Sequence, residues 1–263
     1  MKKITSNGVY SRAEVYDVLF GWDRSAEFLF VDSVFQLHGL NPGDRLLELA
    51  CGTGVCSLHL EVLGWVMEGL DLSTSMVEAF NRRAREQGRG MVGHEGDMTN
   101  FRLKKSFDGA YCPLGSIGLL SDDRSMLGHF NAVGKAVRPG GLYLVDLGLN
   151  PNGTAPLDLD EVNWLMEGKS WNVHAVGGKV LLEDSDGKIL EELEWEGVPL
   201  EFESSHFFRL IKESEVWEVV ASYPEAEFSE EGISLFDPSI EGLNGDEDRA
   251  MILLKRKEFS YGK

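Results

Sequence analysis

Apolar residues recur with two different periods along the 263-residue chain, and the pattern changes near residue 150. Before that point, short apolar runs alternate with segments in which apolar residues recur at helical spacing. The runs predict strands at residues 46–50, 65–72, 90–98, 107–115 and 142–150, and the segments between them predict helices at 55–63, 73–88 and 122–137. Such an alternation is typical of an α/β fold with a doubly wound, mostly parallel sheet and helices on both faces.

The segments that flank this core have other patterns. Residues 10–38 carry apolar positions near helical spacing, interrupted at Gly21 and Trp22, which predicts an N-terminal helical cap. Residues 151–210 hold strand-like runs separated by glycine turns, which predicts an antiparallel β insertion.

Towards the C-terminus the pattern is less regular. We expect a helix at residues 212–223 and a final strand at 248–257, whereas the acidic stretch 231–248 has no assignable element. The expected division of the chain is a cap at 1–40, a core at 41–150, an insertion at 151–210 that serves as a substrate lid, and a segment at 211–263 that completes the core sheet.

Composition narrows the range of partners and compartments. The chain has 25 Lys and Arg against 44 Asp and Glu, a net charge of -19, which argues against a nucleic-acid partner because phosphate binding requires clustered cations. Cys51, Cys56 and Cys112 have no metal-like spacing, so we expect neither a metal site nor a disulfide framework. The N-terminus has no apolar core and no long apolar run follows, so we expect a cytoplasmic protein without a membrane partner.

The segment from Glu48 to Gly54, ELACGTG, joins the first predicted strand of the core to its helix. A strand that ends in small residues leaves main-chain N–H groups at the carboxyl edge of the sheet, and glycine lets a ligand approach them closely. Asp71 ends the next strand, where a carboxylate can accept hydrogen bonds from both hydroxyls of a ribose. The acidic Glu48 disfavours a pyrophosphate and favours a cationic ligand.

These motifs, in the order LELACGTG, GLDLS, GDM and FDGAYC, resemble the class I S-adenosylmethionine-dependent methyltransferases of the small-molecule type. The resemblance covers residues 40–150, and more weakly the final strand, and implies a Rossmann-like sheet of seven strands. It departs from the family at Ala50, where many members have glycine. The residues that it places on the cofactor S-adenosylmethionine are Tyr16, Glu48, Ala50, Cys51, Gly52, Gly54, Asp71, Leu72, Met76, Asp97, Met98, Cys112 and Pro113.

The resemblance also implies a role for each part of this set. The turn from Glu48 to Gly54 would line the methionine moiety, with Glu48 near the sulfonium or the amino group. Asp71 would hold the ribose and Leu72 would pack on the adenine. Asp97 would face the adenine amino group with the help of the Met98 main chain. Cys112 and Pro113 would lie by the methionine amino group and the methyl, and the Tyr16 hydroxyl would reach the cofactor carboxylate.

Several of these residues also have a purely structural interpretation. Asp71 is placed to serve the N-terminus of the helix that follows it, and an aspartate such as Asp97 often opens a loop. Tyr16 fits an amphipathic anchor, and Cys112 fits a small buried residue.

The expected reaction is methyl transfer to an N or O atom of a small-molecule acceptor. A base is needed only when the acceptor arrives protonated, and the candidates are the two histidines of the insertion, His174 and His206. Tyr16 is a third catalytic candidate, through the contact with the cofactor that the resemblance implies. The cap and the insertion would close over the carboxyl edge of the sheet, in a monomer or a homodimer. The alternatives are an aminopropyl transferase on the same fold, which the sequence CPLG after the fourth strand disfavours, and a non-catalytic S-adenosylmethionine-binding partner or sensor.

Overall fold

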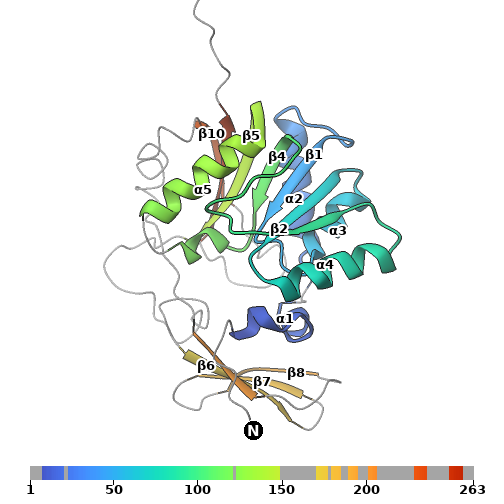
Figure 1. Cartoon of the computed structure of the whole chain (residues 1–263), viewed down its shortest axis with the longest axis vertical. Coiled ribbons are helices and arrows are strands. Elements are labelled where there is room, and N and C mark those ends of the chain that lie inside the picture. The colour runs from blue at the N-terminus through green and yellow to red at the C-terminus, as the bar shows by residue number, and fades with distance from the viewer. Residues whose placement is uncertain are drawn as a thin grey trace, which may run out of the picture.

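The structure is a computed structural model, and it describes residues 8–20, 23–120, 123–148, 170–176, 179–184, 189–194, 201–205, 228–235 and 249–256. The described residues form a larger and a smaller sheet (Figure 1). The larger sheet has seven strands in the order β10-β11-β5-β4-β1-β2-β3, and the smaller has four in the order β8-β7-β6-β9.

Five strands of the larger sheet run parallel to one another. They are β1 (Arg45–Leu49), β2 (Val66–Asp71), β3 (Val92–Glu95), β4 (Phe107–Cys112) and β5 (Val137–Gly148). β1 pairs with β2 on one side and with β4 on the other, so the strand order reverses between β1 and β4. Open α/β sheets bind ligands at the carboxyl ends of the strands that flank such a reversal. The predicted α/β class with a mostly parallel sheet is confirmed.

Helices cover both faces of this sheet (Figure 1). α2 (Ser25–Leu37), α3 (Val55–Val62) and α4 (Thr74–Glu86) share one apolar cluster with Leu46 of β1, whereas α5 (Asp123–Ala136) shares the other with Leu47. Successive side chains of a strand point to opposite faces, and a strand buried on both faces therefore reads as a continuous apolar run. This explains why Leu46, Leu47 and Leu49 of β1 are all buried although they point to different faces.

The structure differs from the sequence-based expectation at two strands. Residues 138–141, RPGG, separate the predicted helix from the predicted strand and were expected to form a turn. β5 instead begins at Val137 and contains them as an irregularity in which Phe107 pairs with Val137 and Gly109 with Leu142. β10 (Phe228–Leu235) was not predicted, because its glutamates obscure the alternation of an edge strand. β10 pairs antiparallel with β11 (Arg249–Arg256), which pairs antiparallel with β5. The helix expected at 212–223 lies outside the described residues.

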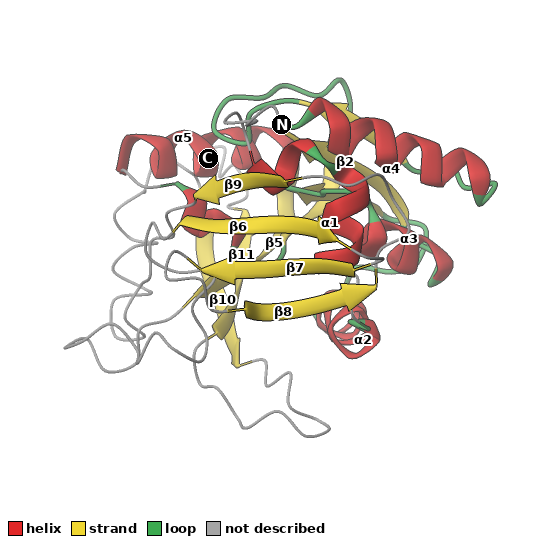
Figure 2. Ribbon diagram, turned by 90° about the horizontal axis from the view of Figure 1, so that it is seen from below, coloured by secondary structure: helices red, strands yellow, loops and turns green. Residues whose placement is uncertain are grey.

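The N-terminal helices and the smaller sheet lie near each other. The predicted helical segment contains η1 (Gly8–Ser11), α1 (Ala13–Leu19) and α2. The smaller sheet is formed by β6 (Ser170–Val176), β7 (Lys179–Asp184), β8 (Ile189–Glu194) and β9 (Glu201–Ser205), all paired antiparallel as the insertion was expected to be. β9 contacts η1 and β8 contacts α1, and Figure 2 shows this sheet face-on with α1 behind it. No helix among the described residues combines the length and the apolar character that a membrane crossing requires.

Candidate functional site

The turn between β1 and α3 has a backbone that few residue types adopt. Ala50, Gly52 and Gly54 all have positive φ, at 50°, 53° and 81°, and a non-glycine residue in this region costs about 1–2 kcal/mol. A Cβ added to Gly54 would lie 2.4 Å from the ring of Phe80. A Cβ added to Gly52 would lie 3.2 Å from the ring of Tyr16. Close packing therefore excludes a side chain at Gly54, whereas at Gly52 a Cβ would require a small shift of the Tyr16 ring.

Asp71 connects this turn to the next helix. Its Oδ2 accepts a hydrogen bond from the Gly52 N–H at 2.8 Å, and its Oδ1 accepts one from the Ser73 N–H at 2.9 Å. Burial raises the pKa of Asp71, and these backbone hydrogen bonds oppose the rise. The N-cap of α4 is Ser73, whose hydroxyl accepts a hydrogen bond from the Met76 N–H at 3.4 Å, so Asp71 supports the helix start without being the cap. The side chain of Leu72 beside it is 70% exposed.

Glu48 lies under the turn and is fully buried. Its Oε2 accepts hydrogen bonds from the Ser57 N–H at 2.9 Å and from the Ser57 hydroxyl at 2.5 Å, which ties β1 to the first turns of α3. Burial raises the pKa of Glu48 to about 7, against the effects of the Ser57 hydrogen bonds and the positive charge of Arg24. The carboxyl group is therefore poised between its neutral and ionised forms near neutral pH.

Tyr16 of α1 lies over the turn at Gly52. Its ring centroid lies 4.6 Å from that of Phe20 and 6.0 Å from that of Tyr10. Burial raises the pKa of Tyr16, so its hydroxyl stays protonated and can donate a hydrogen bond. The position over Gly52 fits both the predicted contact with a ligand and the interpretation as a packing anchor.

A buried ionic group near Glu48 was missed by the sequence analysis. Arg24 binds Glu27 through two hydrogen bonds, Nε to Oε2 at 3.1 Å and Nη2 to Oε1 at 2.5 Å, and the Tyr111 hydroxyl donates to the same Oε1 at 2.6 Å. The side chains of Arg24 and Glu27 are only 9% and 5% exposed. The only sequence signal is a pair of opposite charges three positions apart at the start of a helix, a pattern that is usually solvent-exposed.

Asp97 and Met98 belong to the loop that follows β3. Asp97 is exposed, and its Oδ1 accepts hydrogen bonds from the Thr99 N–H at 2.8 Å and hydroxyl at 2.7 Å, so it does open a turn. The Met98 carbonyl lies 3.2 Å from Nδ1 of the buried His129, whose Nε2 lies 2.6 Å from the Tyr143 hydroxyl. Because a carbonyl only accepts, Nδ1 carries the proton and Nε2 accepts from tyrosine. Burial lowers the pKa of His129 to about 4, so this pairing is stable at neutral pH.

The remaining candidates are apolar or sulfur-containing residues near the carboxyl ends of the strands. Cys51, Cys56 and Cys112 are buried free thiols, and burial raises the pKa of each. Pro113 is buried next to Cys112, which follows the expectation of small buried residues at the end of β4. The described residues contain no group of three or more His, Cys, Asp or Glu side chains that could hold a metal ion.

The two insertion histidines are placed only in part. His174 is on β6, where its Cα pairs with Leu181 and Glu201, and His206 lies outside the described residues. Their role as a base stays a prediction.

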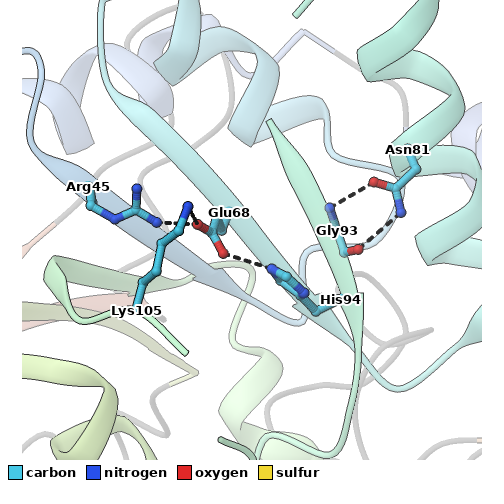
Figure 3. A network of polar contacts seen from close by, with 6 residues as sticks. All are labelled: Arg45, Glu68, Asn81, Gly93, His94 and Lys105. Carbon is cyan, nitrogen blue, oxygen red and sulfur yellow. Dashed lines mark hydrogen bonds and ion pairs between the residues drawn. The ribbon is translucent and has the colours of Figure 1, made fainter. Parts of the chain in front are cut away.

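A second polar network lies towards the amino ends of the strands and supports the sheet (Figure 3). Glu68 of β2 binds Arg45 of β1, and its carboxylate oxygens lie 2.7 Å from His94 Nε2 and 3.7 Å from Lys105 Nζ. Asn81 of α4 binds the main chain of β3 through both its amide oxygen and its amide nitrogen. These contacts join neighbouring strands and one helix, so the network has a structural role in the sheet.

Comparisons with known proteins point to one family. Residues 46–141 match the model of a methyltransferase domain. The chain is 30% identical over 147 residues to the dTDP-3-amino-3,6-dideoxy-alpha-D-glucopyranose N,N-dimethyltransferase of Streptomyces fradiae, a match that spans 55% of this chain and 56% of that protein. It is 28% identical over 137 residues to the dTDP-3-amino-3,4,6-trideoxy-alpha-D-glucopyranose N,N-dimethyltransferase of Streptomyces venezuelae, spanning 51% and 56%. The chain thus matches little more than half the length of these relatives.

Solved structures share the fold over nearly the whole chain. The crystal structure of an S-adenosylmethionine-dependent methyltransferase from Clostridium acetobutylicum superposes with a TM-score of 0.67 at 19% identity, covering 96% of this chain and 100% of that one. A sugar N-methyltransferase from Streptoalloteichus gives a TM-score of 0.62 at 22% identity, covering 98% and 100%.

Proposed function

We propose that residues 46–141, which match the model of a methyltransferase domain, form a class I S-adenosylmethionine-dependent domain, and that this protein transfers a methyl group to an N or O atom of a small-molecule acceptor. The observation that carries the proposal is the hydrogen bond between the Gly52 N–H and the Asp71 carboxylate, with Tyr16 lying over the same glycine. These two contacts place the carboxyl ends of β1 and β2 beside α1, at the glycine turn.

The residues of this place fit the adenosyl half of the cofactor. The Asp71 carboxylate accepts backbone hydrogen bonds from Gly52, Leu72 and Ser73. Because its two oxygens offer about four acceptor positions, a ribose hydroxyl can be bound without loss of the existing contacts. The exposed side chain of Leu72 offers an apolar surface for the adenine ring. The exposed carboxylate of Asp97 would face the adenine amino group, with the Met98 main chain held by His129.

The methionine half would lie along the turn. At Gly52 and Gly54 the ligand could approach the main chain closely, and Ala50 and Cys51 belong to the same turn. Met76, which packs against Ala13 of α1, would lie at one side of the ligand. The Tyr16 hydroxyl would donate to the cofactor carboxylate, and the nearby guanidinium of Arg24 would supply a complementary positive charge. The partly ionised Glu48 would favour the cationic end, with Cys112 and Pro113 bounding the methyl.

The proposed methyl transfer depends more on the alignment of the two reactants than on acid–base catalysis. Bound S-adenosylmethionine carries a methyl group already activated by its sulfonium. The residues of this chain would align the acceptor with the S–CH₃ bond and exclude water, and such alignment contributes about 7–11 kcal/mol. A neutral amine acceptor needs no base before attack; for a protonated acceptor the proposed bases are His174 and His206. Tyr16, whose hydroxyl stays protonated, would contribute by positioning the cofactor.

The cap and the insertion would form the acceptor pocket. We assign residues 1–40 to a cap and 151–210 to a lid, and the contacts of β8 and β9 with α1 and η1 support this arrangement. Residues 211–263 would complete the core sheet through β11. The acceptor would be a small molecule, and the matched relatives act on amino sugars carried on dTDP, which makes such sugars the first to test. A net charge of -19 agrees with a partner other than nucleic acid; we further propose a cytoplasmic monomer or homodimer.

Calorimetric titration of the full chain with S-adenosylmethionine, S-adenosylhomocysteine and NAD tests the cofactor assignment. Micromolar binding of the first two without binding of NAD is the expected result, and binding of NAD alone would contradict the proposal. Turnover of an amino-sugar nucleotide, followed by S-adenosylhomocysteine formation, would then separate an enzyme from a non-catalytic S-adenosylmethionine-binding partner or sensor.

A further inference from the structure

Three segments that are distant in the sequence meet at Thr53, the residue between the two glycines of the turn. The Thr53 hydroxyl donates a hydrogen bond to Oδ1 of Asp17, which belongs to α1. The guanidinium of Arg83, from α4, donates to the Thr53 carbonyl through Nη1 and to Oδ2 of Asp17 through Nη2, the latter at 2.9 Å. Thr53 itself is 1% exposed. We call this group, Asp17, Thr53 and Arg83, the clamp.

The clamp acts at the point where α1 covers the turn. Asp17 directly follows Tyr16, and the Tyr16 ring lies 3.2 Å from the place where a side chain at Gly52 would begin. Holding Asp17 on Thr53 therefore sets the distance between the Tyr16 hydroxyl and the main chain of the turn.

The apolar packing of α1 on α4 is small. The cluster between the two helices consists of Ala13, Met76 and Ala79, with Tyr10 and Tyr16 packed against it. α1 has seven residues and no side-chain cap at its N-terminus, and an isolated helix of this length is unstable in water. α1 therefore stays helical only while it is packed against α4 and the turn. The clamp contributes charge-assisted hydrogen bonds to this packing.

We propose that Asp17 and Arg83 are positioning residues that hold the N-terminal helix closed over the glycine turn and thereby control how long the cofactor and its product remain bound. The proposal rests on the proposed function, because the turn is taken to be the cofactor site. Ligand bound between Tyr16 and Asp71 would leave only when α1 moves away from the turn, and that movement breaks the clamp. Loosening the clamp should therefore act mainly on dissociation, because related complexes differ mostly in their dissociation rates.

The test compares Arg83→Met with a matched control, Arg138→Met, in the full chain. Arg138 forms a similar partly exposed ion pair with Asp108 at 2.6 Å, between the beginnings of β4 and β5, away from the turn. Affinity for S-adenosylhomocysteine is measured by calorimetry, and its dissociation rate by stopped-flow displacement. We expect Arg83→Met to weaken the affinity about fivefold to tenfold, with a matching rise in the dissociation rate, as the loss of partly exposed charge-assisted hydrogen bonds implies. Arg138→Met should bind as the wild type does.

A second variant and a second readout separate positioning from general destabilisation. Asp17→Asn should give a loss similar to that of Arg83→Met, and the double variant should lose no more than the larger of the two, since both act through one clamp. Amide hydrogen exchange at Val15 and Tyr16, whose N–H groups bind the Arg12 carbonyl, should speed up in Arg83→Met but not in Arg138→Met.

The outcomes are distinct. If the wild type does not bind S-adenosylhomocysteine, the proposed function and the clamp both fail. If the wild type binds and Arg83→Met binds equally well, the clamp alone is refuted. Equal losses in Arg83→Met and Arg138→Met would also refute it, because the effect would then be one of overall stability.

Discussion

Replacing Glu48 by glutamine tests the electrostatics of the site most directly. Glu48 is 2% exposed and lies at the end of a parallel strand, so ionisation places a charge where water cannot solvate it. Burial raises its pKa from the ordinary value of 4.5 to about 7. The folded state therefore favours the protonated carboxyl, and the stability that this gives is complete below pH 4.5 and is lost as the pH rises through 7.

The size of the effect follows from the change in pKa. A pKa change of one corresponds to about 1.4 kcal/mol. A carboxyl raised from 4.5 to about 7 thus loses about 3 kcal/mol of unfolding free energy between the two ends of the titration. The amide introduced by Glu48→Gln cannot ionise, although its oxygen can still accept the hydrogen bond that the Ser57 N–H donates to Glu48.

The assay is urea unfolding of the wild type and Glu48→Gln at a series of pH values from about 5 to about 8. The variant removes only the titration of Glu48, so subtraction of the two curves isolates it from every other ionisable group. Between about pH 5 and about pH 8 the difference should move in favour of the variant by about 2.5 kcal/mol, because the rest of the titration lies below this range. A difference that stays constant within the error of the extrapolation would refute the raised pKa.

The same carboxyl also predicts a signature of cofactor binding. A bound cation near Glu48 favours the ionised form and lowers its pKa, so S-adenosylmethionine binding near pH 7 should release a fraction of a proton. Titration calorimetry in buffers of different ionisation enthalpy measures this fraction. It should disappear in Glu48→Gln, and its persistence there would assign the proton to another group.

Other substitutions test the turn and its surroundings. Asp71→Ala should weaken S-adenosylmethionine binding by about tenfold or more, because a hydrogen bond to a charged group contributes about 1.5–3 kcal/mol; an unchanged affinity in calorimetry would remove Asp71 from the ribose role. Gly54→Ala places a Cβ 2.4 Å from Phe80 at a positive φ, whereas Gly88→Ala meets only the φ penalty because nothing lies within 4 Å. The first should therefore unfold at lower urea by about 1–3 kcal/mol more than the second, and equal losses would mean that the core adapts. His129→Phe removes the histidine partner of the buried Tyr143 hydroxyl and of the partly buried Met98 carbonyl, and it should lower the unfolding free energy by about 1–3 kcal/mol at neutral pH; a melting temperature equal to that of the wild type would exclude this hydrogen-bond chain.

The local patterns of the sequence were sufficient to locate the turn. Apolar runs and helical spacing depend on neighbours within a few residues, so they placed β1, α3, β2 and α4 within two residues of their observed ends. The helix predicted from residue 73 begins at Thr74, with Ser73 as its N-cap. At Asp97 both interpretations remained open, since a carboxylate that opens a turn can also face a ligand.

Elements that depend on pairing with a distant strand were harder to predict. β10 has no clear alternation of its own and exists because β11 offers an edge on which it pairs. The Arg138–Gly141 segment reads as a turn by its residue types, yet β4 draws it into β5 as an irregular stretch.

The sequence alone therefore determined the order of strands and helices from β1 to β5, the glycine turn and the position of the acidic residue at the end of β2, because each follows from short-range conformational preference. Only the tertiary structure decided which charged side chains meet at that turn. The Tyr111–Glu27 hydrogen bond joins residues 84 positions apart, and the Arg83–Asp17 and Thr53–Asp17 bonds join residues 66 and 36 apart. No local pattern specifies such partners, because they come into contact only when the packing of the helices brings distant segments of the chain together.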